Sequence, residues 1–218
     1  VADVGFQAPQ RLFRATHHSQ SLEFELMKRG IPYDYRGGMK FFDRAHIKDA
    51  LSFLKIMVNK DDQVAWLRAL SLQIGIGGVT ATKIYDRVRV LPDHESVVDG
   101  VDGLPSKASV GWRDFLAIYR ELLRAKGSPA AMLRAVSESD EYKRYLENEY
   151  PDYRDRVSDV EELANFAERY EDADAFLADA TLRDDMGVGK RKGQPDKVNP
   201  LQPVDLVILF TILLIVVI

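Results

Sequence analysis

The sequence predicts a mainly α-helical protein with a small α/β part near the N-terminus. Apolar residues recur at helical spacing almost throughout residues 61–185, as they do on the buried faces of amphipathic helices. Ahead of them, Ile31, Tyr33 and Tyr35 alternate with polar residues, which is the period of a half-buried strand. A long helix follows this strand directly, and a strand that leads into a helix is typical of an α/β sheet.

Composition and charge narrow the classes of function. The 218 residues include no cysteine, which excludes disulfides and thiolate metal sites, and the four histidines lack a metal-ligand spacing. We therefore expect no metal site, and the absence of cysteine fits a reducing cytoplasm. The net charge of −4 is unevenly spread, because residues 137–186 hold six Lys/Arg and seventeen Asp/Glu. A nucleic-acid contact is thus expected in the first two thirds of the chain, and the acidic run is expected to be a solvated helical face.

The first 60 residues predict strands and helices in alternation. Residues 11–15 (RLFRA) have the composition of a short strand, Ser19 is a suitable N-cap for a helix, and Gly30 is a suitable stop for it. After the second strand, a Gly-Gly pair turns the chain sharply. Asp43 is the expected N-cap of the long helix that follows. Three residues set the apolar face of that helix, Ile47, Leu51 and Leu54.

From residue 61 the sequence predicts a succession of helices. Asp61 or Asp62 is expected to cap the first of them, and Ser128-Pro129 is a later start signal. Residues 92–109 are rich in Pro, Gly, Asp and Ser and predict a loop or short-helix connector. The tryptophan at the start of the next helix has helical spacing with other apolar residues and is expected in the core. The later helices are expected at residues 111–126, 142–149, 152–170 and 173–184.

Residues 71–84 (SLQIGIGGVTATKI) predict a helix, a glycine-containing turn and a second helix. The pattern Gly-hydrophobic-Gly followed by Thr-Ala resembles a helix-hairpin-helix element. The N–H groups at the start of the second helix carry a partial positive charge, and glycines let a DNA phosphate approach them. The alternative is a tight turn that needs glycine only for its backbone angles. The residues expected to bind DNA are Gly75, Ile76, Gly77, Gly78, Thr80 and Lys83.

The C-terminal residues predict a linker and an apolar tail. Residues 184–200 are rich in Gly, Lys, Asp and Pro, as in a mobile return linker. The stretch from Leu206 to Ile218 is apolar apart from Thr211, and it is shorter than the ~18 residues of a membrane-spanning helix. Its β-branched content favours a buried strand. We therefore expect no membrane partner.

Eight residues around the Gly-Gly pair stand in a distinctive order, Tyr33, Gly37, Gly38, Phe41, Arg44, Ile47, Lys48 and Asp49. With them the chain closely resembles the second motor domain of UvrD/Rep/PcrA-type superfamily 1 DNA helicases. The resemblance implies a partial RecA-like (2A-like) segment at residues 11–60 and a helical 2B-like subdomain at residues 61–185. Residues 186–218 would be the linker and a strand-like tail that returns to the 2A-like segment. In this family, a Gly-Ile-Gly loop of the 2B subdomain touches the duplex ahead of the fork.

The resemblance also bears on nucleotide binding. The family has an arginine that touches the γ-phosphate of ATP in the segment matched by residues 14–23, so Arg14 and Gln20 are the nucleotide-binding candidates here. Gln20 stands at the arginine position, and an amide supplies no fixed positive charge. No Gly-x-x-x-x-Gly-Lys-Ser/Thr phosphate loop occurs, and residues 187–190 (GVGK) match only part of one. ATP and Mg²⁺ are therefore expected in the full-length parent and not in this chain alone.

The resemblance implies a fragment of an ATP-dependent DNA helicase, a class that serves DNA repair, which contributes duplex DNA binding and regulation of unwinding. Its expected partners are duplex DNA, a single-stranded junction and the rest of the helicase motor. No residue pattern predicts a nucleophile with its base, so no catalytic residue is expected in this chain. Two alternatives remain: a stand-alone helix-hairpin-helix DNA-binding module without a motor, and an interaction protein tethered to a membrane by the apolar tail.

Overall fold

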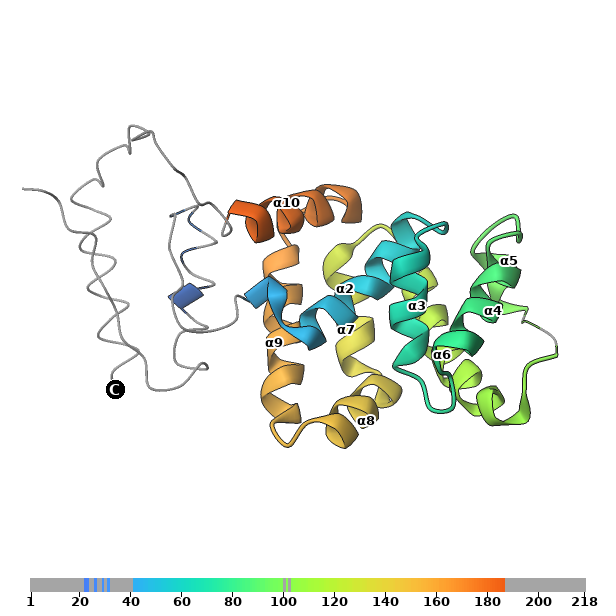
Figure 1. Cartoon of the computed structure of the whole chain (residues 1–218). Coiled ribbons are helices and arrows are strands. Elements are labelled where there is room, and N and C mark those ends of the chain that lie inside the picture. The colour runs from blue at the N-terminus through green and yellow to red at the C-terminus, as the bar shows by residue number, and fades with distance from the viewer. Residues whose placement is uncertain are drawn as a thin grey trace, which may run out of the picture. The chain divides into compact units, whose positions relative to one another are not determined.

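Helices joined by short turns make up the part of the chain that a computed structural model describes, residues 22, 23, 26, 29, 31, 41–99, 101 and 103–186 (Figure 1). This confirms the mainly helical prediction, and these residues contain no strand. In chain order the elements are the 3-10 turn η1 (Phe41–Asp43) and the helices α2 (Ala45–Val58), α3 (Gln63–Ser71), α4 (Gly78–Val88), α5 (Glu95–Val98), α6 (Ser106–Arg124), α7 (Pro129–Glu138), α8 (Asp140–Glu149), α9 (Tyr153–Ala167) and α10 (Ala173–Met186).

The side-chain caps expected from the sequence are present at the starts of α3 and α7. Oδ1 of Asp62 accepts a hydrogen bond from the Ala65 N–H at 2.9 Å, and Oγ of Ser128 accepts one from the Ala131 N–H at 3.3 Å. Each cap satisfies a backbone donor that has no partner within its own helix. Both caps confirm the sequence prediction. Such caps can be predicted because a capping side chain and the N–H that it binds are close together in the chain.

The start of α2 differs from the prediction. Asp43 does not cap this helix, because Asp43 ends the turn η1 and Arg44 stands at the N-cap without a side-chain cap bond. Asp43 instead accepts a hydrogen bond from Nζ of Lys48 at 2.6 Å. The turn η1 buries Phe41 and Phe42. Burying one such ring is worth about 1.5–3 kcal/mol, which exceeds the roughly 1 kcal/mol of a typical cap.

The connector before α6 is shorter than the expected residues 92–109. It contains the one-turn helix α5, and α6 begins at Ser106. Pro105 stands at the N-cap of α6, and Ala108 is fully buried, so the first turn of α6 already packs on the core. Gly111 therefore lies inside a helix, where glycine costs about 1 kcal/mol relative to alanine. Its contact with the turn between α3 and α4 explains this glycine, as shown below.

One hydrophobic core runs through the helical body. The Trp66 ring lies 5.4 Å from the Phe115 ring and 5.7 Å from the Tyr119 ring, measured between centroids. The Phe53 ring stacks on the Phe115 ring at 6.1 Å. Trp112 is only 6% exposed, which confirms the core position expected for it. Aromatic pairs at such distances add about 0.5–1.5 kcal/mol each beyond the area that they bury.

Helix α2 lies at the centre of this body and contacts α3, α6, α7 and α9 (Figure 1). Its residues Ile47, Phe53 and Leu54 are fully buried. The expected boundary between the 2A-like and 2B-like segments falls in the turn between α2 and α3. Because α2 shares one core with the later helices, it is packed as part of the helical body. All described residues lie in one of the two compact units of the chain, Val1–Gly187.

Most of the expected α/β part lies outside the described residues. This holds for residues 11–15, for residues 32–40 and for the linker and tail after residue 186. The RecA-like segment and the strand-like tail therefore stay predictions. Within the described ranges, no helix combines the length and apolar character needed to cross a membrane.

Candidate nucleic-acid interface

The turn between α3 and α4, residues 72–77, is held by its own backbone and by the buried side chains of Gln73 and Ile76. The Gln73 N–H donates to the Leu70 carbonyl at 3.0 Å, and the Ile76 N–H donates to the Gln73 carbonyl at 3.1 Å. The Ile76 side chain is 4% exposed and anchors the turn in the core. Ile76 therefore offers only backbone atoms to a ligand. This segment is called the α3–α4 turn below.

Two glycines allow the α3–α4 turn to touch the start of α6. Gly75 has a φ of +77°, and a Cβ there would lie 2.1 Å from the carbonyl oxygen of Lys107. Across the same contact, a Cβ at Gly111 would lie 2.2 Å from the carbonyl oxygen of Ile74. Backbone meets backbone here only because neither glycine has a side chain. Gly75 thus has a reason to be glycine that is independent of any ligand.

Gly77 and Gly78 face open space, since a Cβ on either would meet no described atom within 4 Å. Gly77 is the N-cap of α4 and provides no side-chain cap. The first hydrogen bond of the helix runs from the Ala81 N–H to the Gly77 carbonyl at 2.9 Å. The N–H groups of Gly78, Val79 and Thr80 precede that bond and have no partner within the helix. These three donors form the positive end of the helix dipole, where an anion is stabilised.

The opposite end of α4 is already neutralised. Nζ of Lys60 donates hydrogen bonds to the carbonyl oxygens of Val88, Arg89 and Leu91 at 3.4, 3.1 and 2.6 Å. A cation at these carbonyls stabilises the negative end of the helix dipole. Lys60 therefore stabilises the fold. The N-terminal end of α4, by contrast, has no acidic residue in its own first turn.

Two exposed lysines lie close to the open end of α4. Lys83 lies on α4 itself, and Lys107 lies in the first turn of α6, with its Cγ 3.3 Å from the position of a Cβ on Gly75. In the part of the chain that the structure describes, no carboxylate lies within ion-pairing distance of either lysine. Lys83 is a sequence candidate. Nothing in the sequence around Lys107 indicates that it touches a turn so much earlier in the chain.

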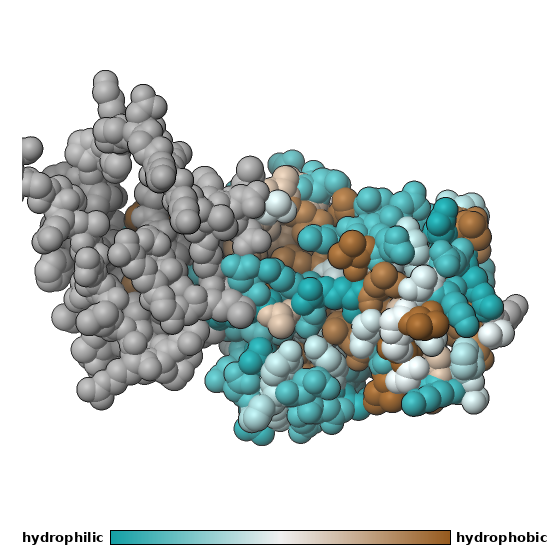
Figure 2. All heavy atoms as spheres, in the orientation of Figure 1, coloured by the Kyte–Doolittle hydropathy of each residue, from teal (hydrophilic) through white to brown (hydrophobic). Residues whose placement is uncertain are grey.

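Exposed aliphatic side chains surround the same place. Ile74 is 57% exposed, Val79 is 74% exposed and Val110, next to Gly111, is 44% exposed. Hydrophobic residues alternate with hydrophilic ones on the surface formed by α3 to α6 (Figure 2). Backbone donors, cations and aliphatic groups together suit a nucleic acid, whose phosphates accept hydrogen bonds and whose sugars present apolar faces.

A buried polar cluster, which the sequence does not reveal, joins the start of α2 to α9. Nη1 of Arg44 donates to Oδ2 of Asp159 at 3.0 Å, and Nε2 of His46 lies 2.7 Å from the same oxygen. Nη1 of Arg156 lies 3.0 Å from Nδ1 of His46. Because arginine only donates, Nδ1 of His46 accepts and Nε2 carries the ring proton toward Asp159.

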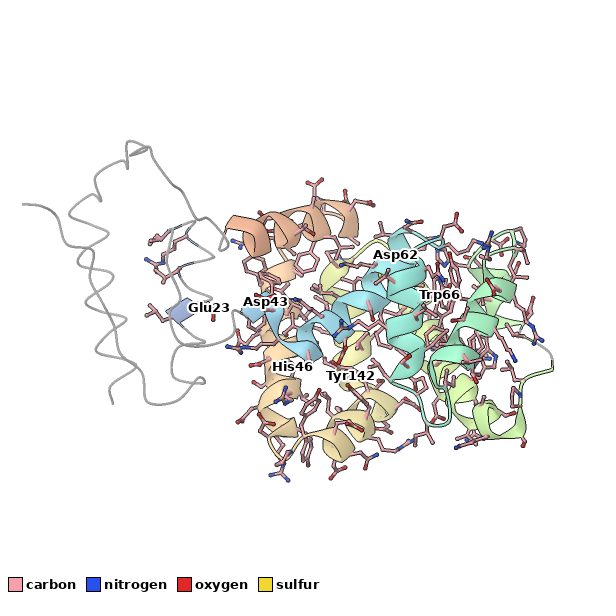
Figure 3. The ribbon with its side chains drawn as sticks, viewed as in Figure 1. Glu23, Asp43, His46, Asp62, Trp66 and Tyr142 are labelled. Atoms are coloured by element: carbon pink, nitrogen blue, oxygen red, sulfur yellow. The ribbon has the colours of Figure 1, made fainter. Side chains whose placement is uncertain are left out.

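The same cluster reaches the residues that precede η1. Glu23 accepts a hydrogen bond from the Phe41 N–H at 2.9 Å, and its Oε2 lies 3.7 Å from Nη2 of Arg44. Glu23, Arg44, His46 and Asp159 are each less than a tenth exposed. Figure 3 labels Glu23, which precedes η1, and His46, which lies in α2; the place where these two segments meet is the junction. Its charged groups face one another, so the cluster fixes the junction and presents no open site.

Asp49 is a second buried carboxylate on α2. Its Oδ1 accepts from Nε of Arg68 at 2.7 Å, and its Oδ2 accepts from the hydroxyl of Tyr145 at 3.1 Å. Burial raises the pKa of Asp49 above its ordinary value, and the charge of Arg68 opposes that rise. Burial also raises the pKa of Tyr142, whose hydroxyl donates to the His46 carbonyl at 2.8 Å. Asp49 carries part of the family resemblance, and here it ties α2 to α3 and α8.

The other sequence candidates lie elsewhere. Arg14 and Gln20, expected near a nucleotide, lie outside the described residues and stay predictions. Among the residues that are described, no group of three His, Asp or Glu side chains is placed to hold a metal ion.

Comparison with known proteins gives consistent matches. A family model described as the UvrD-like helicase C-terminal domain matches residues 8–96. The chain is 28% identical over 185 residues to the ATP-dependent DNA helicase PcrA of Bacillus subtilis (strain 168), which covers 78% of this chain and 25% of that protein. It is 27% identical over 170 residues to the PcrA of Staphylococcus aureus (strain Mu50), covering 74% of this chain and 23% of that protein. The chain thus spans about a quarter of the length of these curated relatives.

Proposed function

Because this chain is a C-terminal segment of the UvrD/PcrA helicase type, we propose that its α3–α4 turn binds the phosphate backbone of duplex DNA. The observation that supports the proposal most is the open N-terminal end of α4. Backbone donors are accessible there beside Gly77 and Gly78, where a Cβ would meet no described atom within 4 Å. The proposed contact set is Gly75, Ile76, Gly77, Gly78, Thr80 and Lys83.

The residues of this set have different roles in the proposal. Gly75 and Ile76 hold the turn in place, the first against α6 and the second in the core. Gly77 and Gly78 leave room for a phosphate, which the N–H groups up to Thr80 bind. Lys83 adds a positive charge nearby. Such a site binds any duplex sequence, because phosphates carry no base information.

Within the whole protein, we propose that this contact holds the duplex ahead of the fork and regulates its unwinding by the motor. The relatives that match are named ATP-dependent DNA helicases. The proposal therefore includes ATP and Mg²⁺ as cofactors of the full-length parent, with Arg14 and Gln20 near the nucleotide. It also includes a single-stranded junction and the rest of the motor as partners, in the cytoplasm and without a membrane.

The Gly77→Asp change tests the proposed contact. A carboxylate at the N-cap would occupy the place of the phosphate and repel it, so we expect duplex affinity to fall roughly tenfold or more at low salt. Fluorescence anisotropy of a labelled duplex at two salt concentrations measures this, with circular dichroism to verify folding. The gentler change Lys83→Ala is expected to reduce the salt dependence by about one phosphate contact.

Ser158→Asp is the matched control for Gly77→Asp. It adds the same charge at an exposed position of α9, and we expect it to leave duplex affinity within about twofold of the parent. If folded Gly77→Asp binds duplex as well as the parent does, the α3–α4 turn is only a connection between helices.

The chain alone is expected to show no ATPase activity, because neither a phosphate loop nor a set of Mg²⁺ ligands occurs in its sequence. A coupled assay with and without single-stranded DNA measures this in protein free of other helicases. Turnover that rises with added single-stranded DNA and persists through further purification would contradict the expectation.

A stand-alone DNA-binding module is the second candidate, and the single core shared by the described helices favours it. It predicts the same duplex binding by the α3–α4 turn. Extending the reading frame in both directions separates the two candidates, since an upstream phosphate loop supports the helicase.

A further inference from the structure

We propose that Lys107, on α6, is a second phosphate-binding residue of the same interface, so that the duplex rests across the N-terminal ends of both α4 and α6. This inference rests on the proposed function of the α3–α4 turn. It extends the surface to a helix on which the sequence indicates no site.

The contact between the α3–α4 turn and α6 fixes where Lys107 lies. Gly75 packs against the Lys107 carbonyl, and Gly111, one turn further along α6, packs against the Ile74 carbonyl. Two such contacts set both the distance and the rotation of α6 relative to the turn. Because Lys107 lies on a helix and not on a loop, its exposed side chain is held beside the proposed phosphate site.

The N-terminal ends of α4 and α6 have no negatively charged side chain of their own to balance the positive ends of their dipoles. Neither α4 nor α6 has an acidic residue in its first turn, and neither has a side-chain cap bond at its N-cap. Two positive helix ends thus meet, and Lys107 adds a full positive charge to them. A cation in the first turn of a helix is unfavourable, because it opposes the helix dipole. An anion that binds here would relieve this repulsion.

The chemistry of the surface selects a polyanion with regularly spaced phosphates. One phosphate at the start of α4 would engage backbone donors, and another on the same strand would reach Lys107 as a point charge. Aliphatic groups at Ile74 and Val110 border the path between them and suit the sugars of the backbone. A duplex offers this arrangement without regard to sequence.

Lys107→Ala in the 218-residue chain tests the inference by duplex anisotropy across a salt series. Loss of one phosphate contact should lower the log–log salt slope by about 0.9 and weaken binding roughly five- to tenfold near 0.1 M salt. Lys107→Arg should keep the slope of the parent. Lys126→Ala is the matched control, since it removes the same charge just beyond the other end of α6. That position is ~28 Å away at 1.5 Å per residue, and no change is expected there.

Gly77→Asp, measured alongside, separates failure of this inference from failure of the proposed function. If Lys107→Ala behaves like Lys126→Ala while Gly77→Asp weakens binding, the α3–α4 turn binds DNA without α6 and the inference is overturned. If neither Lys107→Ala nor Gly77→Asp changes the affinity, or the parent binds no duplex, the proposed function fails and the inference fails with it. Folding of every variant is verified by circular dichroism.

Discussion

Gly75→Ala is expected to destabilise the protein by about 3 kcal/mol or more, a loss in the range of disruptive core substitutions. Alanine at a φ of +77° is strained by about 1–2 kcal/mol. In addition, its Cβ would lie 2.1 Å from the Lys107 carbonyl oxygen and 2.9 Å from the carbonyl carbon. These are backbone atoms, so no side-chain rotation relieves the overlap. The α3–α4 turn or the start of α6 must move, and Ile76 is then pulled from the core.

Gly78→Ala is the internal control for this prediction. A Cβ on Gly78 meets nothing within 4 Å among the described atoms, and the residue begins a helix, where alanine is favoured. We expect the stability to be unchanged or to rise by up to about 1 kcal/mol. Urea unfolding followed by circular dichroism measures both variants. Equal stability of the Gly75 and Gly78 variants would mean that the contact with α6 is not rigid.

Asp159→Ala is expected to cost about 3–5 kcal/mol, because it leaves buried Arg44 and His46 without their shared acceptor. Without Asp159, the desolvated Arg44 charge keeps Glu23, 3.7 Å away, but loses its closer hydrogen-bonded partner, which costs more than the pair itself contributes. For a chain of this size, the loss corresponds to a fall in Tm of roughly 6–20 °C. Differential scanning calorimetry measures it directly.

Glu162→Ala gives the comparison on the same helix. Glu162 is exposed, and we expect its replacement to change stability by no more than about 0.5 kcal/mol. The two changes remove the same charge from one acidic run, so any difference between them reflects burial and pairing. Equal effects of the two substitutions would show that Arg44 and His46 find other partners when Asp159 is lost.

The helical architecture could be predicted because its signals are local. Asp62 and Ser128 cap helices whose first turns lie within three residues of them, and the apolar spacing of Trp112 is repeated along one helix. Asp43 has the same local signal and fails. There the burial of two phenylalanines in a 3-10 turn decides the backbone, and η1 packs against α10, which lies much later in the chain.

The remaining features depend on pairs that sequence spacing does not connect. Asp159 lies in the strongly acidic run expected to be solvated, yet it pairs with Arg44 across 115 residues. Its spacing to Leu163 and Phe166, both buried, places it on the inward face of α9 and is the one signal that could have singled it out. For Lys107 no such signal exists, because its proposed role depends on which backbone packs against Gly75.

The contact of the α3–α4 turn with α6 also affects how the history of this protein can be traced among its relatives. Gly75 and Gly111 are required by the contact of two backbones, so natural selection for a stable fold is enough to preserve them. Their persistence in a lineage therefore carries no information about DNA. Gly77 and Gly78 have no such constraint, since a Cβ at either position meets no described atom within 4 Å. If the proposed duplex contact is lost in a lineage, Gly77 and Gly78 are therefore free to change before Gly75 and Gly111 do.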